Sequence, residues 1–219
     1  MIGGTSVKAF PVPPLPTLGE LAEGTLVKLN EDGAPVEFYV AKHDYESELN
    51  GVGRTLVVRK DVYDYRVWDY GMVNDYASSD LDSWFNGTYQ NILDSDIRSL
   101  IGTTKIRYTP TPGNGNGTVG TLERAVFALS ITEMGESSTY ANVEGSELPI
   151  ASTLQIAYQG GSATTQWTRS PATNNRVSSF FQNSNGTFGA VACTSTYGSR
   201  PCFTLPSTVL VDEAMNIVA

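Results

Sequence analysis

The sequence predicts a single α+β domain with short helices in its first half and a loop-rich, β-rich C-terminal half. Three observations lead to this prediction. Hydrophobic residues make up 40% of the 219-residue chain and charged residues 17%, a balance typical of a chain that buries a core. Helical patterns are concentrated between residues 79 and 102, after several strand-like segments. Beyond residue 154, short apolar segments alternate with glycine, serine, threonine and asparagine.

A proline-rich arm is predicted to precede the domain, with residues 1–16 as the arm and residues 17–219 as the domain. Four prolines between residues 11 and 16 favour an extended, polyproline-type backbone that builds no core of its own. We therefore expect the arm to be held by a partner subunit or, alternatively, by packing on its own domain.

Three strands are expected before the helices, at Thr25–Leu29, Val36–Lys42 and Arg54–Lys60. The first two flank the turn-forming pair Asp32-Gly33, and such a pair between two apolar segments indicates a β-hairpin.

Two short helices follow these strands. Ser79 stands three residues before Asp82, which is the spacing of an N-terminal capping box, and Gly87 is expected to end the helix that starts there. Asp94–Gly102 is predicted as the second helix, with Asp94 as its cap and the glycine as its stop.

The middle of the chain is expected to hold a short strand from Lys105, a glycine-rich loop at residues 111–120 and then the best buried strand, Arg124–Ser130. Ser130–Glu133 has the capping-box pattern of one further helical turn.

Net charge excludes several classes of partner. The formal charge is −9, which argues against a nucleic-acid backbone and against an anionic membrane surface.

No apolar run is long enough for a membrane-spanning helix, so no membrane insertion is expected. The N-terminus also lacks the pattern of a secretory signal.

Metal binding and catalysis find little support. His43 stands among acids in "KHDYESE", but no further nitrogen or sulfur ligands have a zinc-like spacing and no calcium-binding loop is present, so a solvated acidic surface is favoured. No serine-nucleophile motif or phosphate-binding loop occurs. Cys193 and Cys202 are interpreted as small buried apolar residues, or else as a pair facing each other across a hairpin. No cofactor and no metal are expected.

Four residues are expected to form the structural scaffold of the second half: Trp84, Trp167, Arg169 and Arg200. A tryptophan between a helix and a sheet is usually part of the core, although either ring could instead stack on a sugar. Each arginine is expected to hold loop carbonyls and a buried acid, with Asp80 or Asp82 as the partner; the alternative is a grip on a ligand carboxylate.

The segment between these scaffold residues, from Pro171 to Ser199, is predicted to carry a ligand-binding face. Small polar residues adapt their hydrogen bonds and aromatic rings give large contact area at low entropic cost. The alternative is an ordinary loop-rich half-domain with Phe180 or Phe181 in its core. The candidate binding residues are Asn174, Asn175, Arg176, Phe180, Phe181, Asn183, Asn185, Phe188 and Tyr197.

Five segments together resemble a known family: "TLGELAEGTLVKL", "SSDLDSWFNGTY", "AVFALSITEMG", "QWTRSP" and "YGSRPCFTLP". They are similar, in this order, to uncharacterised domains common in gut bacteria and their phages. The resemblance runs from about Thr17 to Pro206. The chain departs from the family pattern where "LDSWFN" lacks the usual arginine before tryptophan, and at Ser199 and Cys202 in the closing motif.

This resemblance implies a C-type-lectin-like fold, similar to that of formylglycine-generating enzymes. Those enzymes use a cysteine pair, but the residues around Cys193 and Cys202 do not match them, so an enzyme is not expected. Domains of the resembled kind often end phage tail or surface proteins, and some carry loops that diversity-generating retroelements rewrite.

The function expected from this resemblance is that of a non-enzymatic phage virion protein, located in the particle. It would form homo-oligomers, attach to other virion subunits through the arm, and recognise a bacterial surface protein or glycan. The alternative is a purely structural decoration or tail subunit without its own ligand.

Overall fold

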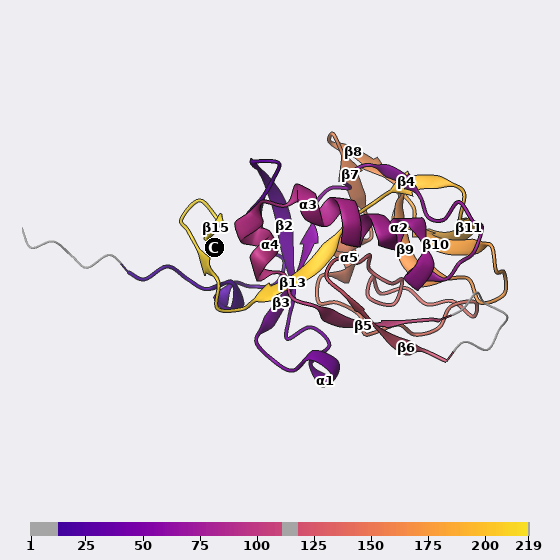
Figure 1. Ribbon diagram of the computed structural model, residues 1–219, viewed down its shortest axis with the longest axis horizontal. Helices are drawn as coiled ribbons and strands as arrows, with labels where there is room; N and C mark the ends of the chain where they lie inside the picture. Colours follow the sequence, from indigo (N-terminus) through magenta and orange to yellow (C-terminus); the bar gives the residue numbers. More distant parts are fainter. Residues whose placement is uncertain (1–12, 111–117, 219) are drawn as a thin grey trace, which may run out of the picture.

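The computed structural model describes residues 13–110 and 118–218 (Figure 1). Most of the predicted arm, residues 1–12, and most of the glycine-rich loop, residues 111–117, lie outside the described residues. No described helix is both long and apolar enough to cross a membrane.

The fold is mostly sheet with a few short helices, which agrees with the predicted α+β class. The strands are β1 (Leu26–Glu31), β2 (Ala34–His43), β3 (Arg54–Arg59), β4 (Tyr65–Val67), β5 (Thr104–Tyr108), β6 (Gly120–Arg124), β7 (Ala157–Gln159), β8 (Ser162–Thr164), β9 (Gln166–Pro171), β10 (Ser178–Gln182), β11 (Phe188–Ala192), β12 (Thr196–Gly198), β13 (Cys202–Pro206), β14 (Leu210–Val211) and β15 (Ile217–Val218). The α-helices are α1 (Ser47–Asn50), α2 (Asp80–Trp84), α3 (Gln90–Ile92), α4 (Ser95–Leu100) and α5 (Ala151–Leu154), and short 3-10 turns lie at Leu18–Glu20 and Tyr76–Ser78.

The first sheet has the strand order β1-β2-β3-β13 and is antiparallel throughout. It contains the three strands predicted for the start of the chain. Asp32 and Gly33 both have positive φ, at 48° and 74°, as a two-residue hairpin turn between β1 and β2 requires. The predicted hairpin is therefore confirmed.

The first helical segment is longer than expected. Ser79 caps α2 by accepting a hydrogen bond from the Asp82 N–H at 3.1 Å. Gly87 does not end the helix, because the chain continues through a π-helical turn at Phe85–Tyr89 into α3. Both end residues of that turn, Phe85 and Tyr89, are buried with their rings in contact, and this packing outweighs the low helix propensity of one glycine.

The second helix, α4, begins after Asp94, but this carboxylate does not cap it. It accepts instead from the Gly33 N–H at 3.0 Å, and so ties the helix to the β1–β2 turn.

The strand predicted at Arg124–Ser130 is wrong. β6 ends at Arg124, and beyond it only Phe127 forms an isolated bridge, with Cys202. The segment is as buried as expected, but side chains take its backbone groups: Asn86 accepts from the Ala125 and Val126 N–H groups and Tyr76 accepts from that of Ala128.

The second sheet has the order β11-β10-β9-β12-β4, with β12 parallel to β9 and every other pair antiparallel. One hydrophobic core extends over both sheets and the helices, and a small second cluster comprises Ile131, Ala172 and Phe180.

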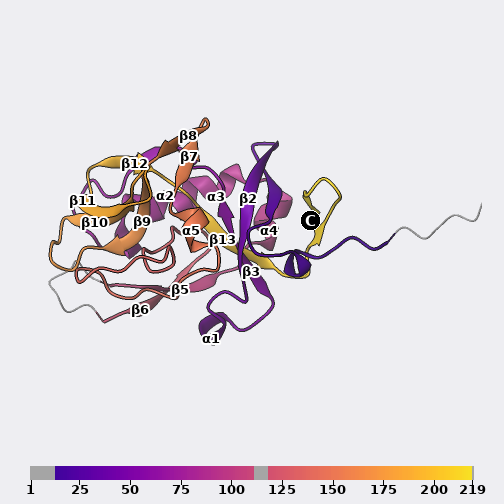
Figure 2. The same cartoon turned by 180° about the vertical axis from the view of Figure 1, so that it is seen from behind.

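Both described ends of the chain lie at the end of the molecule opposite the second sheet (Figures 1 and 2). Thr17 forms a β-bridge with Leu210, and the Val211 N–H donates to the Pro16 carbonyl at 2.8 Å. We call this region the terminal end.

Candidate binding face

Two buried tryptophans fix the second sheet. Trp167, on β9, is 1% exposed and its Nε1–H donates to the Arg66 carbonyl at 2.8 Å, as expected of a scaffold residue. Trp68 follows β4 and is fully buried, and its Nε1–H donates to the Thr168 carbonyl at 2.9 Å. Each of the two segments, β9 and the end of β4, therefore supplies one tryptophan that donates to a backbone carbonyl of the other. The sequence prediction missed Trp68.

Arg169 is fully buried and holds the middle of the chain to β9. It donates to the carbonyls of Arg107 and Ala128, each at 2.9 Å, and pairs with Glu133 at 2.6 Å. The expected partners, Asp80 or Asp82, are wrong, since Asp82 pairs with Arg124. The geometry of the Ser130–Glu133 turn explains this, because its reciprocal capping bonds hold the glutamate in the core.

Two buried carboxylates complete this network. Glu133 accepts from the Tyr45 hydroxyl at 2.5 Å in addition to Arg169, and Glu144 accepts from the Thr109 N–H at 2.6 Å and the Ser170 hydroxyl at 2.5 Å. Burial raises the pKa of Glu144 above its usual value. Every carboxylate oxygen of the pair already has a donor, so the network holds the fold together.

Arg200 lies where the chain passes from the second sheet to the first. It donates to the carbonyls of Arg59, Lys60 and Leu154 at 2.7–2.9 Å. The expectation that it holds loop carbonyls is met, but it forms no ion pair with an acid within the described residues. Burial lowers its pKa to about 10, so the guanidinium remains charged at neutral pH.

Trp84 occupies a more open position than a core residue. It is half-buried on α2, and the guanidinium carbon of Arg66 lies 3.7 Å from its ring centroid. The Tyr63 ring packs on it at 5.4 Å. Its Nε1–H is buried and meets no acceptor in the described part of the chain.

Cys193 and Cys202 are buried and unpaired. The Ser179 hydroxyl lies 3.6 Å from the Cys193 sulfur, and the Cys202 thiol donates to the Phe127 carbonyl. Burial raises the pKa of Cys193 to about 11 and that of Cys202 well above its usual value, so neither is a thiolate at neutral pH.

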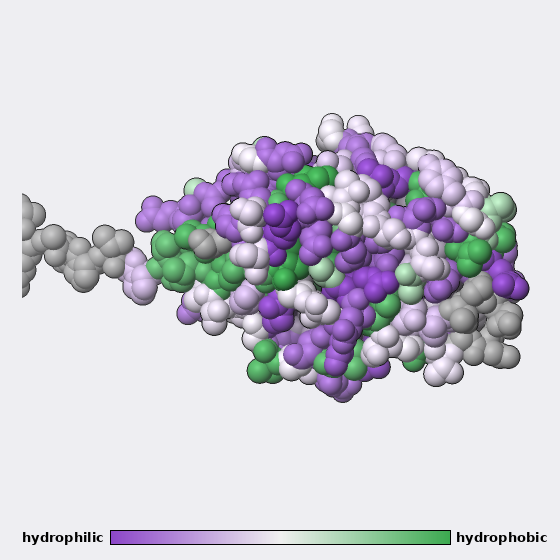
Figure 3. All heavy atoms as spheres, viewed as in Figure 1, coloured by the Kyte–Doolittle hydropathy of each residue, from purple (hydrophilic) through white to green (hydrophobic). Residues whose placement is uncertain are grey.

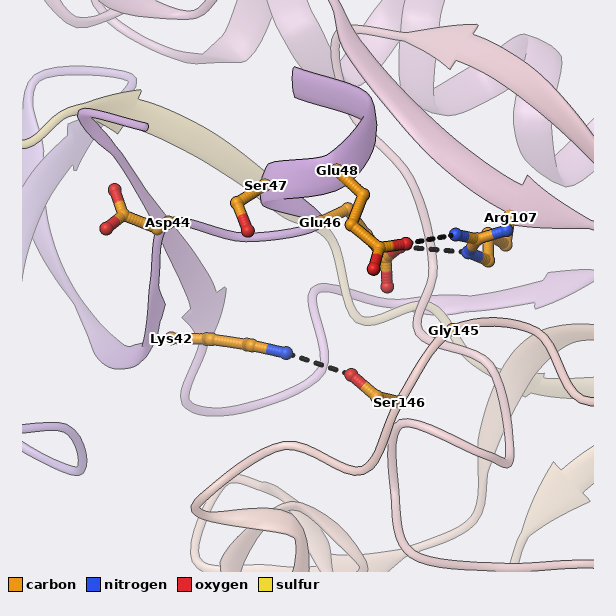
Figure 4. A pocket seen from close by; sticks show the side chains of 8 residues that line it. All are labelled: Lys42, Asp44, Glu46, Ser47, Glu48, Arg107, Gly145 and Ser146. Atoms are coloured by element: carbon orange, nitrogen blue, oxygen red, sulfur yellow. Dashed lines mark hydrogen bonds and ion pairs between the residues drawn. The ribbon is translucent and has the colours of Figure 1, made fainter. Parts of the chain in front are cut away.

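The acidic "HDYESE" stretch borders a cavity of about 350 Å³ (Figure 4). Two of its acids pair with one arginine, since Arg107 lies 3.1 Å from Glu46 and 3.2 Å from Glu48, and the Lys42 ammonium donates to the Ser146 hydroxyl at 2.9 Å. Within residues 13–110 and 118–218, no group of three or more His, Cys, Asp or Glu side chains is placed to hold a metal ion.

His43 also has a structural position. Its ring nitrogens contact the Thr55 hydroxyl at 2.9 Å and the Leu21 carbonyl at 2.8 Å, which leaves it no free nitrogen for a metal.

Three of the candidate binding residues form one exposed turn. Asn174, Asn175 and Arg176 lie between β9 and β10 with their side chains exposed. The buried Asn74 fixes this turn: its amide donates to the carbonyls of Ala172, Asn175 and Ser178 at 2.8–3.0 Å.

Asn183 and Asn185 lie at the other end of β10, which spans about 16 Å, so they do not join that turn. Their side chains shape the β10–β11 turn. Asn185 accepts from the Thr187 N–H and hydroxyl, and Asn183 accepts from the Ser184 N–H.

The candidate aromatic residues pack on both faces of β10. Phe180 is 3% exposed and lies in the small second cluster, against Phe188 at 6.1 Å, so its assignment to a displayed face is not supported by its position. Phe181 and Tyr197 lie on the other face, half-buried, with their rings 5.0 Å apart. Successive strand residues point to opposite faces, which explains why neighbouring phenylalanines enter different clusters.

The exposed turn has apolar neighbours that the sequence prediction missed. Tyr70, Met72 and Val73 are 74%, 47% and 40% exposed, and the next residue, Asn74, connects them to the turn. The signal in the sequence was "WDYGMV", an apolar segment around a glycine that matched neither helix nor strand. We define the distal face as Tyr70–Val73 together with Asn174–Arg176.

A family model described as "Domain of unknown function (DUF6273)" matches residues 52–207, more than half of the chain. The matched span includes the whole second sheet and the distal face, but not β1, β2, β14 or β15. No curated protein and no solved structure matches the chain.

Proposed function

The chain belongs to the DUF6273 family, and we propose that it is a non-enzymatic recognition domain, held at its terminal end and binding its target through the distal face. The observation that carries this proposal is the separation of the two ends. Exposed apolar side chains occur beside the chain ends, at Leu15, Leu210 and Val218, and again on the distal face. Figure 3 shows hydrophobic side chains at both ends of the molecule and smaller hydrophobic spots on the surface between them, and Val52 and Val143 are exposed apolar residues outside both regions.

The composition of the distal face suits recognition. It combines apolar side chains that gain free energy when they leave water with amide and guanidinium groups that give direction to hydrogen bonds. Because the Asn74 amide and the Trp68–Thr168 bond hold its two segments, little conformational entropy would be lost on binding.

The proposal extends to the setting of the protein. We propose a C-type-lectin-like fold and a place in a phage particle, with the terminal end joined to other virion subunits and a bacterial surface protein or glycan as the target. The family resemblance of the sequence and the exposed apolar residues of the terminal end support this. A non-enzymatic role is supported by the buried acids and thiols, whose polar atoms are engaged in the fold.

Recognition is tested with the double variant Asn174→Ala/Arg176→Ala. Both side chains are exposed, so the fold should be kept while adherence of the labelled protein to gut-bacterial cells falls about tenfold or more. Lys105→Ala is the matched control, since it removes one exposed positive charge outside the distal face. Equal adherence of the double variant and the wild-type protein would overturn the recognition role and favour a purely structural subunit.

The virion setting is tested separately by mass spectrometry of purified particles from a strain that carries the gene. We expect peptides of this chain at a fixed ratio to the other structural proteins. Their absence from particles, with the protein present in the lysate, would rule out the virion assignment without touching the binding role.

A further inference from the structure

A second feature of this end of the molecule points to the chemistry of the ligand. A cavity of about 150 Å³ lies between β4, the start of α2 and β12. This volume corresponds to about five water molecules, which suits one ring-sized group rather than an extended ligand. Its lining includes the side chains of Tyr65, Arg66, Tyr70, Asp80, Trp84 and Thr196.

Two of the three aromatic rings that line the cavity remain accessible. Tyr70 is 74% exposed and Tyr65 is 48% exposed, whereas Trp84 is half-buried beneath the Arg66 guanidinium. An exposed aromatic ring still releases favourable free energy when a ligand removes it from water. Binding of a ligand whose flat, partly apolar surface covers Tyr70 would be favoured by this free energy.

Polar groups stand around the rings. One Asp80 oxygen accepts from the Tyr70 N–H at 2.7 Å, and the second carboxylate oxygen meets no donor in the described part of the chain. The exposed Thr196 hydroxyl and the Tyr70 hydroxyl likewise form no hydrogen bond with the described residues. Donors and acceptors at the rim of an aromatic pocket select a ligand that carries both, such as a polyol.

The charges exclude ions as the preferred ligand. Arg66 pairs with Asp64 at 2.5 Å, and its guanidinium already covers the Trp84 ring, where a ligand cation would otherwise bind. Asp80 and the net charge of −9 disfavour an anion. An uncharged ligand with hydroxyl groups meets neither obstacle.

We propose that this cavity is a subsite for one neutral sugar ring of a surface glycan, with Tyr70 as the stacking platform and Asp80 and Thr196 as its hydrogen-bonding partners. This inference rests on the proposed recognition role and names its ligand class. The site adjoins the distal face through Tyr70, so a glycan chain seated here would continue toward Met72 and Val73.

The test is a titration of the purified full chain with glucose, galactose, mannose and N-acetylglucosamine. Binding is detected by tryptophan fluorescence and by saturation-transfer NMR. We expect saturable binding of at least one sugar, with no binding of choline or acetate at the same concentrations. Tyr70→Ala should weaken that binding about tenfold or more, and Tyr70→Phe, which keeps the ring, should retain most of it.

Tyr140→Ala is the matched control, because Tyr140 is another exposed tyrosine, at 53%, and does not line the cavity. Thermal unfolding of each variant checks that the fold is kept. The subsite is overturned if no sugar binds, if choline or acetate binds instead, or if Tyr70→Ala binds as the wild type does. If no sugar binds but the Asn174→Ala/Arg176→Ala variant loses adherence to cells, the subsite is refuted and the recognition role is retained.

Discussion

Arg169 shows at the scale of one residue how the fold depends on buried charge. Its guanidinium connects β9 to the segments around Arg107, Ala128 and Glu133, and no solvent reaches it. Removing one partner of such a pair leaves the other charge buried without compensation, which is far more costly than the net gain from forming the pair.

Arg169→Met is therefore expected to lower the free energy of unfolding by about 3–5 kcal/mol, measured by urea denaturation. The exposed Arg176→Met should change it by less than about 0.5 kcal/mol. Adding Glu133→Gln to Arg169→Met should restore part of the loss, because it removes the unpaired charge. A loss below 1 kcal/mol for the single variant, within the roughly 0.5–3 kcal/mol of an ordinary substitution, would contradict this role.

Asp82 gives the molecule a distinct pH dependence. Burial raises its pKa from 3.8 to about 6 despite the ion pair with Arg124. The folded carboxyl therefore holds its proton at pH values where the unfolded one has lost it. Its stabilising contribution is present below pH 4 and is lost as the pH rises through 6.

The difference in unfolding free energy between wild type and Asp82→Asn should thus fall by on the order of 3 kcal/mol between pH 4 and pH 7. Urea denaturation at several pH values measures this. A difference that grows with pH would instead show that the ion pair dominates.

At the scale of secondary-structure elements, two glycines differ in the space around them: one is closely packed and the other is open. A Cβ at Gly198, on β12, would lie 2.6 Å from Val62 Cγ1 and 2.9 Å from the Thr165 carbonyl oxygen. A Cβ at Gly87, in the π-helical turn, would meet nothing within 4 Å.

We expect Gly198→Ala to lower the free energy of unfolding by about 1–3 kcal/mol through overpacking. Gly87→Ala should raise it by about 0.4–1 kcal/mol, because alanine restricts the unfolded chain. Thermal and urea denaturation of the two variants compare them directly. Similar effects in both variants would show that the close approach of β12 to Val62 is not tight.

The elements that the sequence predicted are those with local causes. The β1–β2 hairpin follows from Asp32-Gly33, and the α2 start follows from the Ser79 cap. Arg124–Ser130 failed because side chains from distant segments take its backbone hydrogen bonds. β4 was missed because it has three residues and pairs only with β12, far along the chain.

The candidate site was also predicted only where local sequence determines it. The exposed Asn174–Arg176 turn follows from local composition, and the scaffold role of Trp167 and Arg200 follows from residue type. The contribution of Tyr70, Met72 and Val73 depends on a contact through Asn74 that no local pattern reveals.

The whole molecule has one main hydrophobic core that contains both cysteines, although Cys202 lies on β13 of the first sheet and Cys193 directly follows β11 of the second. Such a shared core is expected to unfold as one cooperative unit. The exposure of each thiol then measures the same global unfolding transition at a different position in the fold.

In native protein, both thiols should resist alkylation. With increasing urea, Cys193 and Cys202 should become reactive at the same midpoint, as resolved by peptide mass spectrometry of quenched samples. Two separate midpoints would mean that the sheets unfold independently.

The pairing of Thr17 with Leu210 also determines how the molecule bears force. Adjacent to the bridge, Pro16 accepts from Val211 on one side and Leu18 donates to Val209 on the other. Tension between the two described chain ends would first load the β14–β15 pairing and the bridge of Asn216 to Lys28 on β1, and then these bonds one after another, starting at Pro16. A pull between the distal face and the terminal end would instead run along the length of the molecule, through the core and the buried arginines, where many interactions share the load.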